Sequence, residues 1–256
     1  MYSDRIFFQY PVESALSARN LLRRRLGGCF EASFELGDMP RTIVVGDIHG
    51  CGTALKVLLK AVALEPNDTL VTLGDYVDRG METPMVIDTL LDVAGRARFI
   101  PLVGNHEVML LQAMSDTQAY QFWMQHGGQQ TLHSYGGRLE LIPPHHRMFL
   151  QHCRRYWEMD RHFFVHANFR SDLPLNQTPD EITLWQHMKL SFPVPHVSGK
   201  KAWVGHTPQL SGEILDLGHL AIIDTNCYGG GYLSAVDVDS GDYWQVDLEG
   251  NLREFA

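Results

Sequence analysis

Short apolar runs recur along the chain, and each predicts a buried β-strand. The five clearest runs are residues 42–45, 68–73, 98–103, 163–165 and 202–204. They are rich in β-branched and aromatic residues, which favour a pleated and packed surface, and each is too short to form a helix of ordinary length. We therefore expect the core of the protein to be built on strands.

Two segments with helical periodicity lie between the first three predicted strands. Residues 51–64 place Leu55, Leu58 and Val62 on one face, which is the spacing of a helix packed against a core. Residues 83–93 form a second such segment, with a proline in its first turn, where a helix tolerates one. The order strand, helix, strand, helix, strand predicts parallel pairing of the three strands.

The remaining segments predict further helices and then a β-rich end. We expect a cap-like helical insert at about 106–157 and a short helix around Trp185. The predicted helices of the insert are 106–114, 117–126 and 145–157. The predicted carboxyl-terminal strands are 202–205, 219–224, 232–238 and 242–247, separated by glycine-containing turns. The fold class that follows is α/β with a β-rich carboxyl third.

An amino-terminal extension, residues 1–40, precedes the main domain that we place at 41–256. Residues 11–26 carry leucines at helical spacing together with several arginines, and a glycine pair follows them. We expect a basic amphipathic helix packed on the domain. A helix that binds a partner or a membrane surface is the alternative.

Composition excludes several classes of protein. The formal net charge of −9 argues against a nucleic-acid binder that uses a broad basic surface. No apolar run is long enough to span a membrane, and the first 30 residues lack the apolar core of a secretory signal. The four cysteines show no paired spacing, which favours free thiols in a reducing compartment. We expect a cytoplasmic monomer that binds neither nucleic acid nor membrane.

Candidate metal ligands follow each of the five strands. The carboxyl ends of strands are where open α/β sheets place their sites, and carboxylate and imidazole groups together suit a divalent cation. The polar residues at these ends are Asp47 and His49, then Asp75, Asp78 and Arg79, then Asn105, His106 and Glu107, then His166, and finally His206.

These residues lie in motifs that resemble the signature set of the phosphoprotein phosphatases, a branch of the calcineurin-like metallophosphoesterases. The motifs are Asp47-Ile-His49, Gly74-Asp-Tyr-Val-Asp-Arg-Gly80, Gly104-Asn-His-Glu107, His166 and Gly205-His-Thr207. They occur in the family's order over about residues 41–240 and are most similar to the compact bacterial and phage-type members. The resemblance implies an αββα sandwich of two mixed β-sheets flanked by helices.

The resemblance also implies two divalent metal ions that share a bridging hydroxide, which attacks the phosphorus atom. The first ion would be held by Asp47, His49 and Asp75. The second would be held by Asn105, His166 and His206, again with Asp75, which therefore bridges the pair. This mixture of carboxylate, amide and imidazole ligands favours Mn²⁺, with Fe or Zn²⁺ as alternatives.

The catalytic roles that the resemblance implies fall on the same loops. His106 would be the general acid and Asp78 its orienting partner, while Arg79 and Asn105 would bind the phosphate group. The chain departs from the phage-type pattern at His187, where a second phosphate-binding arginine is usual. Either His187 takes a weaker role there, or Arg170 or Lys189 substitutes for the arginine.

A serine/threonine protein phosphatase that acts on phosphorylated proteins or small phosphoesters is the function that follows. A dinucleoside tetraphosphate (Ap4A-type) hydrolase is the alternative, although such relatives usually lack a carboxylate at the position of Asp78. A degenerate, non-catalytic binding protein is a third hypothesis, and the histidine at position 187 is the feature that favours it.

Overall fold

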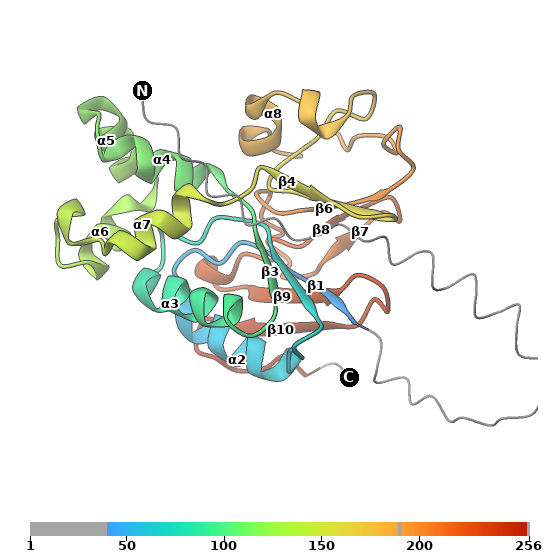
Figure 1. The fold of residues 1–256 in the computed structure, drawn as a ribbon, viewed down its shortest axis with the longest axis horizontal. Coiled ribbons are helices and arrows are strands. Elements are labelled where there is room, and N and C mark those ends of the chain that lie inside the picture. Colours follow the sequence, from blue (N-terminus) through green and yellow to red (C-terminus); the bar gives the residue numbers. More distant parts are fainter. Residues whose placement is uncertain (1–39, 189–190, 255–256) are drawn as a thin grey trace, which may run out of the picture. The chain divides into compact units, whose positions relative to one another are not determined.

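Two five-stranded sheets organise the chain in the computed structural model, which describes residues 40–188 and 191–254 (Figure 1). The predicted basic helix at 11–26 and Lys189 lie outside the described residues. Among the described residues, no helix is both long enough and apolar enough to cross a bilayer.

The first sheet contains the predicted βαβ series. Its strand order is β10-β9-β1-β2-β3, with β1, β2 and β3 parallel and with β9 and β10 antiparallel to their neighbours. The parallel pairing confirms the prediction from the alternation of strands and helices. The strands are β1 (Thr42–Val45), β2 (Thr69–Thr72), β3 (Arg98–Pro101), β9 (Tyr232–Asp237) and β10 (Tyr243–Asp247).

The second sheet is also mixed, with the order β4-β5-β6-β8-β7. Strands β5, β6 and β8 are parallel, and the two edge strands run antiparallel to their neighbours. The strands are β4 (Tyr156–Glu158), β5 (His162–Val165), β6 (Lys201–Val204), β7 (Leu215–Asp216) and β8 (Leu220–Ile222).

The side chains of β1 show how the layers are arranged. Ile43 and Val45 pack in a core with helices α2 (Gly52–Val62) and α3 (Thr83–Ala94). Val44 points the opposite way, into a core that also contains Phe164 and Trp203 of the second sheet. Since alternate residues of a strand face opposite sides of its sheet, the first sheet lies between helices and the second sheet.

The outer face of the second sheet has its own core. Phe163 and Val165 of β5 pack there against Phe169, Leu175 and Met188, which come from the segment after β5. That segment contains the 3-10 helix η4 (Leu175–Gln177) and α8 (Asp180–Trp185). The layers therefore form the αββα sandwich that the sequence predicts.

The predicted helical insert is largely helical. It contains α4 (Asn105–Ala113), α5 (Thr117–Trp123), the π-helix η2 (Met124–Gly128), α6 (Gln129–Ser134), the 3-10 helix η3 (Leu139–Leu141) and α7 (Pro144–Gln151). One further 3-10 helix, η5 (Cys227–Gly229), follows β8.

One predicted helix was too long, and one short strand was not predicted. The helix expected at 145–157 ends at Gln151, and Tyr156–Glu158 forms edge strand β4 instead. The reason is tertiary packing, because Trp157 stacks on Phe164 of the adjacent strand at 5.4 Å and Arg98 lies over its ring. The two-residue strand β7 was not predicted, since so short an edge strand has no periodicity of its own.

A buried carboxylate joins the beginning of β1 to the beginning of β2. Asp68 accepts hydrogen bonds from the backbone N–H of Arg41 at 2.8 Å and from its guanidinium at 2.6 and 3.1 Å. The same guanidinium donates to the carbonyl of Ala63 at the end of α2. Burial raises the pKa of Asp68, but the hydrogen bonds from Arg41 outweigh that effect and hold the pKa below its usual value.

We expect Asp68→Ala to lower the free energy of unfolding by about 2 kcal/mol, because it leaves several part-buried donors without an acceptor. The stabilisation should be present above the ordinary aspartate pKa of about 3.9 and be lost as pH falls through the lower folded-state value. Urea denaturation between pH 3 and 7 measures both effects. The control is Asp172→Ala, which breaks an exposed pair with Arg170 and should lower the free energy of unfolding much less than Asp68→Ala does. Equal losses in the two variants would contradict this account.

Candidate metal centre

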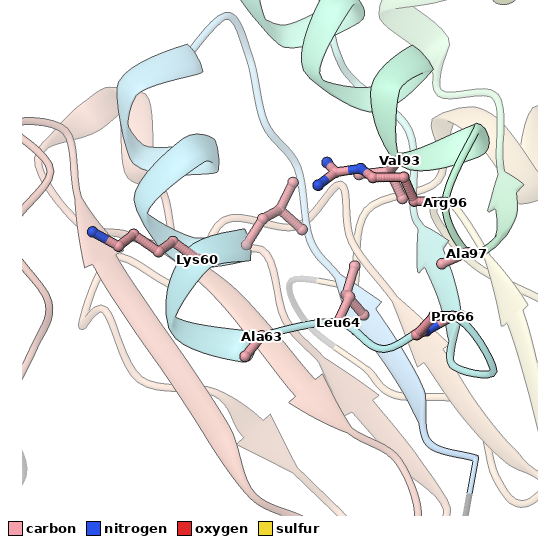
Figure 2. A pocket seen from close by; sticks show the side chains of 8 residues that line it. Lys60, Ala63, Leu64, Pro66, Val93, Arg96 and Ala97 are labelled. Carbon is pink, nitrogen blue, oxygen red and sulfur yellow. The ribbon is translucent and has the colours of Figure 1, made fainter.

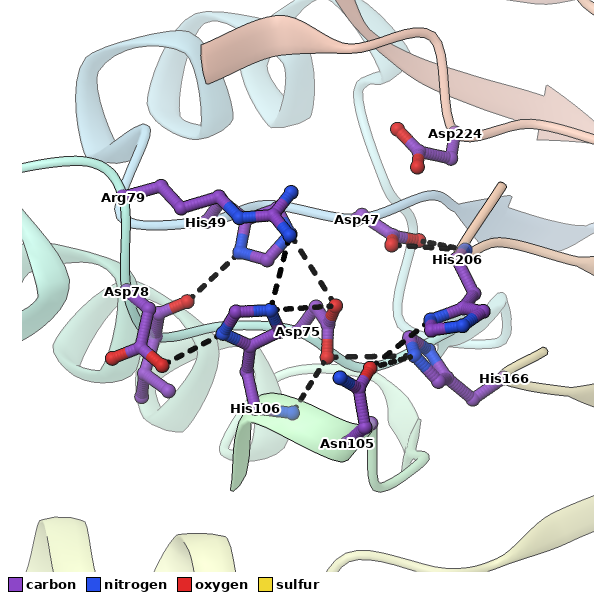
Figure 3. A network of polar contacts seen from close by, with 12 residues as sticks. Asp47, His49, Asp75, Asp78, Arg79, Asn105, His106, His166, His206 and Asp224 are labelled. Atoms are coloured by element: carbon purple, nitrogen blue, oxygen red, sulfur yellow. Dashed lines mark hydrogen bonds and ion pairs between the residues drawn. The ribbon is translucent and has the colours of Figure 1, made fainter. Parts of the chain in front are cut away.

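All of the predicted metal ligands and catalytic residues converge at the carboxyl ends of five strands. The loops after β1, β2 and β3 come from the first sheet, and those after β5 and β6 come from the second, so the site spans the edge of the sandwich (Figure 3). The residues brought together are Asp47, His49, Asp75, Asp78, Arg79, Asn105, His106, His166 and His206.

Asp75 lies at the middle of this group. Its Oδ2 atom is 3.3 Å from His49 Nε2, and its Oδ1 atom is 3.5 Å from His166 Nε2. The two oxygens of one carboxylate therefore face histidines from opposite sides of the site. This placement is what a bridging ligand requires, and the bridging role of Asp75 remains a prediction.

Asn105 is the centre of the second set of ligands. Its Oδ1 atom is 3.0 Å from both His166 Nε2 and His206 Nδ1. Asp47 lies nearby, and its carboxylate accepts a hydrogen bond from the backbone N–H of His206 at 2.9 Å. Asp75, His166 and His206 bring their ligand atoms within 4.8 Å of one another, as do Asp75, His49 and His106.

The protonation states of the histidines suit a metal. Burial lowers the pKa of His49 to about 4 and of His206 to about 3, and it lowers the pKa of His166 as well. Neutral imidazoles have a free lone pair, which is the form that coordinates a cation.

The site also holds an excess of buried negative charge. Burial raises the pKa of Asp47 and, to about 7, that of Asp224, and repulsion from nearby carboxylates adds to both shifts. A bound cation would remove this penalty. The donor set and the unbalanced charge together fit divalent ions, and Asp47, His49, Asp75, Asn105, His166 and His206 are the residues that could hold them.

His106 and Asp78 form a buried dyad beside these ligands. His106 Nδ1 is 2.7 Å from Asp78 Oδ2. Burial lowers the pKa of His106, but the charges of Asp75 and Asp78 outweigh it and raise the pKa. Asp78 is held in turn by Trp123, whose Nε1–H donates to both carboxylate oxygens at 2.8 and 2.9 Å, and by the Thr131 hydroxyl at 2.9 Å.

Arg79 reaches over the site from the same loop as Asp78 (Figure 3). Its guanidinium is 3.2 Å from His106 Nε2 and lies 4.4 Å from the centre of the Tyr228 ring. The Tyr228 ring also meets His49 edge-on at 5.0 Å. Tyr228 thus contacts both the predicted phosphate-binding arginine and a predicted metal ligand.

The Glu107 side chain joins two of the site's loops through hydrogen bonds to their backbones. It is fully buried and accepts hydrogen bonds from the backbone N–H groups of Gly104, Asp75 and Tyr76, each at 2.8 Å, and from Val77 at 3.3 Å. One carboxylate therefore connects the loop after β2 to the loop after β3.

Several residues that build the site have no role predicted from the sequence. Glu107 stands in a quoted motif, so the motif itself was a signal for it. Trp123, Thr131 and Tyr228 carried no such signal, because only the folded chain brings the α5–α6 region and η5 to the site.

Two of the three residues considered for the second phosphate-binding position, His187 and Arg170, lie among the described residues. His187 is exposed and stacks on the ring of His206, with centroids 4.2 Å apart. Arg170 makes a bidentate pair with Asp172 on the surface, with both bonds at 2.8 Å. Of these two residues, His187 is therefore the one that contacts a predicted metal ligand, His206.

Backbone strain is concentrated in these loops. A positive φ costs a non-glycine residue about 1–2 kcal/mol relative to ordinary helical or extended conformations. Five residues predicted for the site have this conformation, with φ between 45° and 71°: His49, Asp75, Asp78, Arg79 and His206.

A separate pocket lies between the ends of α2 and α3 (Figure 2). It has a volume of about 500 Å³ and is lined mainly by apolar side chains, with Lys60 and Arg96 as its charged residues. None of the residues that line it is a predicted metal ligand or catalytic residue, so it does not belong to the candidate centre.

Comparison with known proteins agrees with the geometry. A family model described as calcineurin-like phosphoesterase matches residues 40–235. Serine/threonine-protein phosphatase 1 of Salmonella typhimurium (strain LT2) is 29% identical over 204 residues, which cover 75% of this chain and 88% of that protein. A symmetrical bis(5'-nucleosyl)-tetraphosphatase of Acidovorax ebreus is 28% identical over 215 residues, which cover 82% of this chain and 60% of that protein.

The fold is also similar to that of solved structures. The crystal structure of a candidate diadenosine tetraphosphatase has a TM-score of 0.62 at 22% identity, covering 82% of this chain and 94% of that one. At this identity the similarity shows the fold alone.

The close packing of Gly205 against Asp47 gives a test of the site's geometry. A Cβ atom at Gly205 would lie 1.9 Å from Asp47 Oδ1, so Gly205→Ala must displace that carboxylate. We expect metal affinity to fall about 10–100-fold, the usual effect of disturbing groups that position ligands, as measured by titration of metal-free protein with Mn²⁺. Gly95→Ala is the control, because its Cβ would meet only Asp92 O at 3.5 Å. Unchanged Mn²⁺ affinity in Gly205→Ala would show that Asp47 takes no part in metal binding.

Proposed function

This chain belongs to the calcineurin-like phosphoesterase family, and from that premise we propose that it is a metal-dependent serine/threonine protein phosphatase. The observation that carries the proposal is the His106–Asp78 dyad, with its 2.7 Å hydrogen bond, placed beside the candidate metal ligands. Serine and threonine alkoxides are poor leaving groups, so their phosphoesters gain most from a positioned proton donor.

The named relatives support the proposal and also keep the alternative open. The Salmonella relative is named a serine/threonine-protein phosphatase, and the match extends over most of both chains. The Acidovorax relative, named a symmetrical bis(5'-nucleosyl)-tetraphosphatase, supports hydrolysis of dinucleoside tetraphosphates as the second candidate function.

Two divalent ions would be held by the ligand set around Asp75, and we expect Mn²⁺ to serve best because the set mixes oxygen and nitrogen donors. When bound, such ions act as Lewis acids on phosphate oxygens and lower the pKa of water. In Figure 3, His49 lies on one side of Asp75 and Asn105 and His166 lie on the other, while the Asp47 carboxylate lies beside the backbone of His206.

The chain's own residues would bind the substrate and deliver the proton. Arg79 offers a planar pair of N–H groups for two phosphate oxygens. Its present contact with His106 Nε2 at 3.2 Å would give way to the phosphate, which leaves Nε2 facing the ester oxygen. With Nδ1–H donating to Asp78, a protonated His106 has its second proton on Nε2 and can give it to the departing alkoxide.

Asp78 would keep this proton donor in one orientation. Hydrogen bonds from Trp123 and Thr131 hold the Asp78 carboxylate in place, and its hydrogen bond to His106 helps to raise the pKa of the imidazole. His187 lies against His206 at the edge of the site and would contact the phosphate more weakly than an arginine.

Turnover of two substrates by the Mn²⁺-loaded protein tests the proposal. We expect a phosphoserine peptide to be hydrolysed with a higher kcat/KM than diadenosine tetraphosphate. The opposite order would replace the proposal with the second candidate. Hydrolysis of neither substrate by metal-loaded protein would favour a non-catalytic binding protein.

The role of His106 has a test based on leaving groups. We expect His106→Asn to slow hydrolysis of a phosphoserine peptide by about 10²–10⁴-fold, and to slow hydrolysis of p-nitrophenyl phosphate much less, because p-nitrophenolate leaves without a proton. Steady-state rates on both substrates measure the difference, with metal content determined on the same samples. The control is His126→Asn, which changes an exposed histidine of η2. Equal losses on both substrates, with metals retained, would mean that His106 binds or positions the phosphate and is not the acid.

A further inference from the structure

A second cluster of metal-binding side chains lies at the contact between α3 and α7, outside the motif loops. Asp88 comes from the middle of α3, and His145 and His146 come from the first turn of α7. The two helices lie next to each other in the fold (Figure 1). None of the three residues has a part in the proposed phosphatase reaction, so the cluster needs a separate explanation.

The three side chains already face one another. Asp88 Oδ1 is 2.9 Å from His146 Nε2 and 3.9 Å from His145 Nε2. Ligands around a tetrahedral Zn²⁺ ion lie about 3.3 Å apart, as follows from bond lengths near 2.0–2.1 Å. Coordination would therefore change each of the two distances from Asp88 by about half an ångström, and all three ligand atoms already lie within 4.8 Å of one another. The side chains of Asp88 and His145 can make them, because they are 63% and 60% exposed.

The buried member of the cluster has a partner that would orient it. The side chain of His146 is only 2% exposed, and its Nδ1 atom is 2.7 Å from the Tyr135 hydroxyl. Burial raises the pKa of Tyr135, so this hydroxyl stays neutral. Its oxygen can accept a hydrogen bond from Nδ1–H, which leaves the lone pair of Nε2 free to coordinate. Such an outer hydrogen bond is usual for histidines that bind metals.

We propose that Asp88, His145 and His146 form a binding site for a late first-row transition-metal ion, Zn²⁺ in particular. Three protein ligands with two imidazoles match the ligand number of open zinc sites, and water completes the coordination. Mn²⁺ and Mg²⁺ prefer oxygen-rich sites and bind imidazole sets less tightly than Zn²⁺ or Co²⁺. The ion would link α3 to α7 across their contact and stabilise the folded chain.

Binding of Co²⁺ to the whole chain tests the site. Protein is first loaded with Mn²⁺ and then equilibrated with Co²⁺, and bound cobalt is counted by elemental analysis and by its visible absorption, which is more intense for tetrahedral than for octahedral ions. Because Co²⁺ can also enter the centre around Asp75, the measured quantity is the difference between wild type and His145→Ala. We expect wild type to bind one more Co²⁺ per chain and to show an additional tetrahedral band.

Three further measurements make the result decisive. Asp88→Asn should lose the same ion as His145→Ala, whereas His152→Ala, which removes an exposed histidine just beyond α7, should bind as wild type does. Saturating Co²⁺ should raise Tm by several degrees more in wild type than in His145→Ala, since an ion that binds only the folded state stabilises it. Phosphatase turnover should be the same in His145→Ala and wild type. Equal cobalt content and equal spectra in wild type, His145→Ala and Asp88→Asn would overturn the proposal.

Discussion

The hydrogen bonds accepted by the buried Glu107 carboxylate are the constraint on which the rest of the site depends. Four backbone N–H groups from two loops point at its two oxygens. These bonds fix the loop in which Asp75 has a φ of 51°, a conformation that an aspartate adopts only at a cost of about 1–2 kcal/mol. They also begin α4, so that Asn105 and His106 stand at its first turn. One side chain with no place in the chemistry therefore sets the positions of a predicted bridging ligand, a second ligand and the proposed acid.

The buried aspartates around these loops have two different kinds of surroundings. On the side of Asp47 and Asp224, carboxylates are buried without enough positive charge, and their raised pKa values express that imbalance. On the side of Asp78, the same kind of burial is compensated by donors from Trp123 and Thr131. The first arrangement favours cations that come from solution, whereas in the second the protein's own hydrogen-bond donors satisfy the carboxylate. This contrast fits the separate roles predicted for neighbouring aspartates, which are metal binding for Asp47 and orientation of the proposed proton donor for Asp78.

The sequence predicted the parts of the structure that depend on local pattern. Strands β1 to β3 and their crossover helices followed from apolar periodicity, and the motif residues converge because parallel strands end at the same edge of a sheet. What could not be predicted depends on contacts between distant segments. Trp157 belongs to a strand because Phe164 lies beside it, and Trp123, at the end of α5, donates to Asp78 from 45 residues away in the sequence. The Asp88–His146 contact likewise joins two helices that are separated by the whole of β3 and most of the insert.

The most direct test of this account is the metal content of Glu107→Gln. An amide cannot accept all four N–H groups and places its own N–H₂ against some of them, so the two loops should separate although every predicted ligand is still present. We expect the variant to keep its folded core, as judged by circular dichroism, and to bind Mn²⁺ at least about 10-fold more weakly than wild type, with a matching loss of turnover. Glu140→Gln, which changes an exposed glutamate of η3, should bind Mn²⁺ normally. Wild-type Mn²⁺ affinity and turnover in Glu107→Gln would contradict the claim that this carboxylate positions the site.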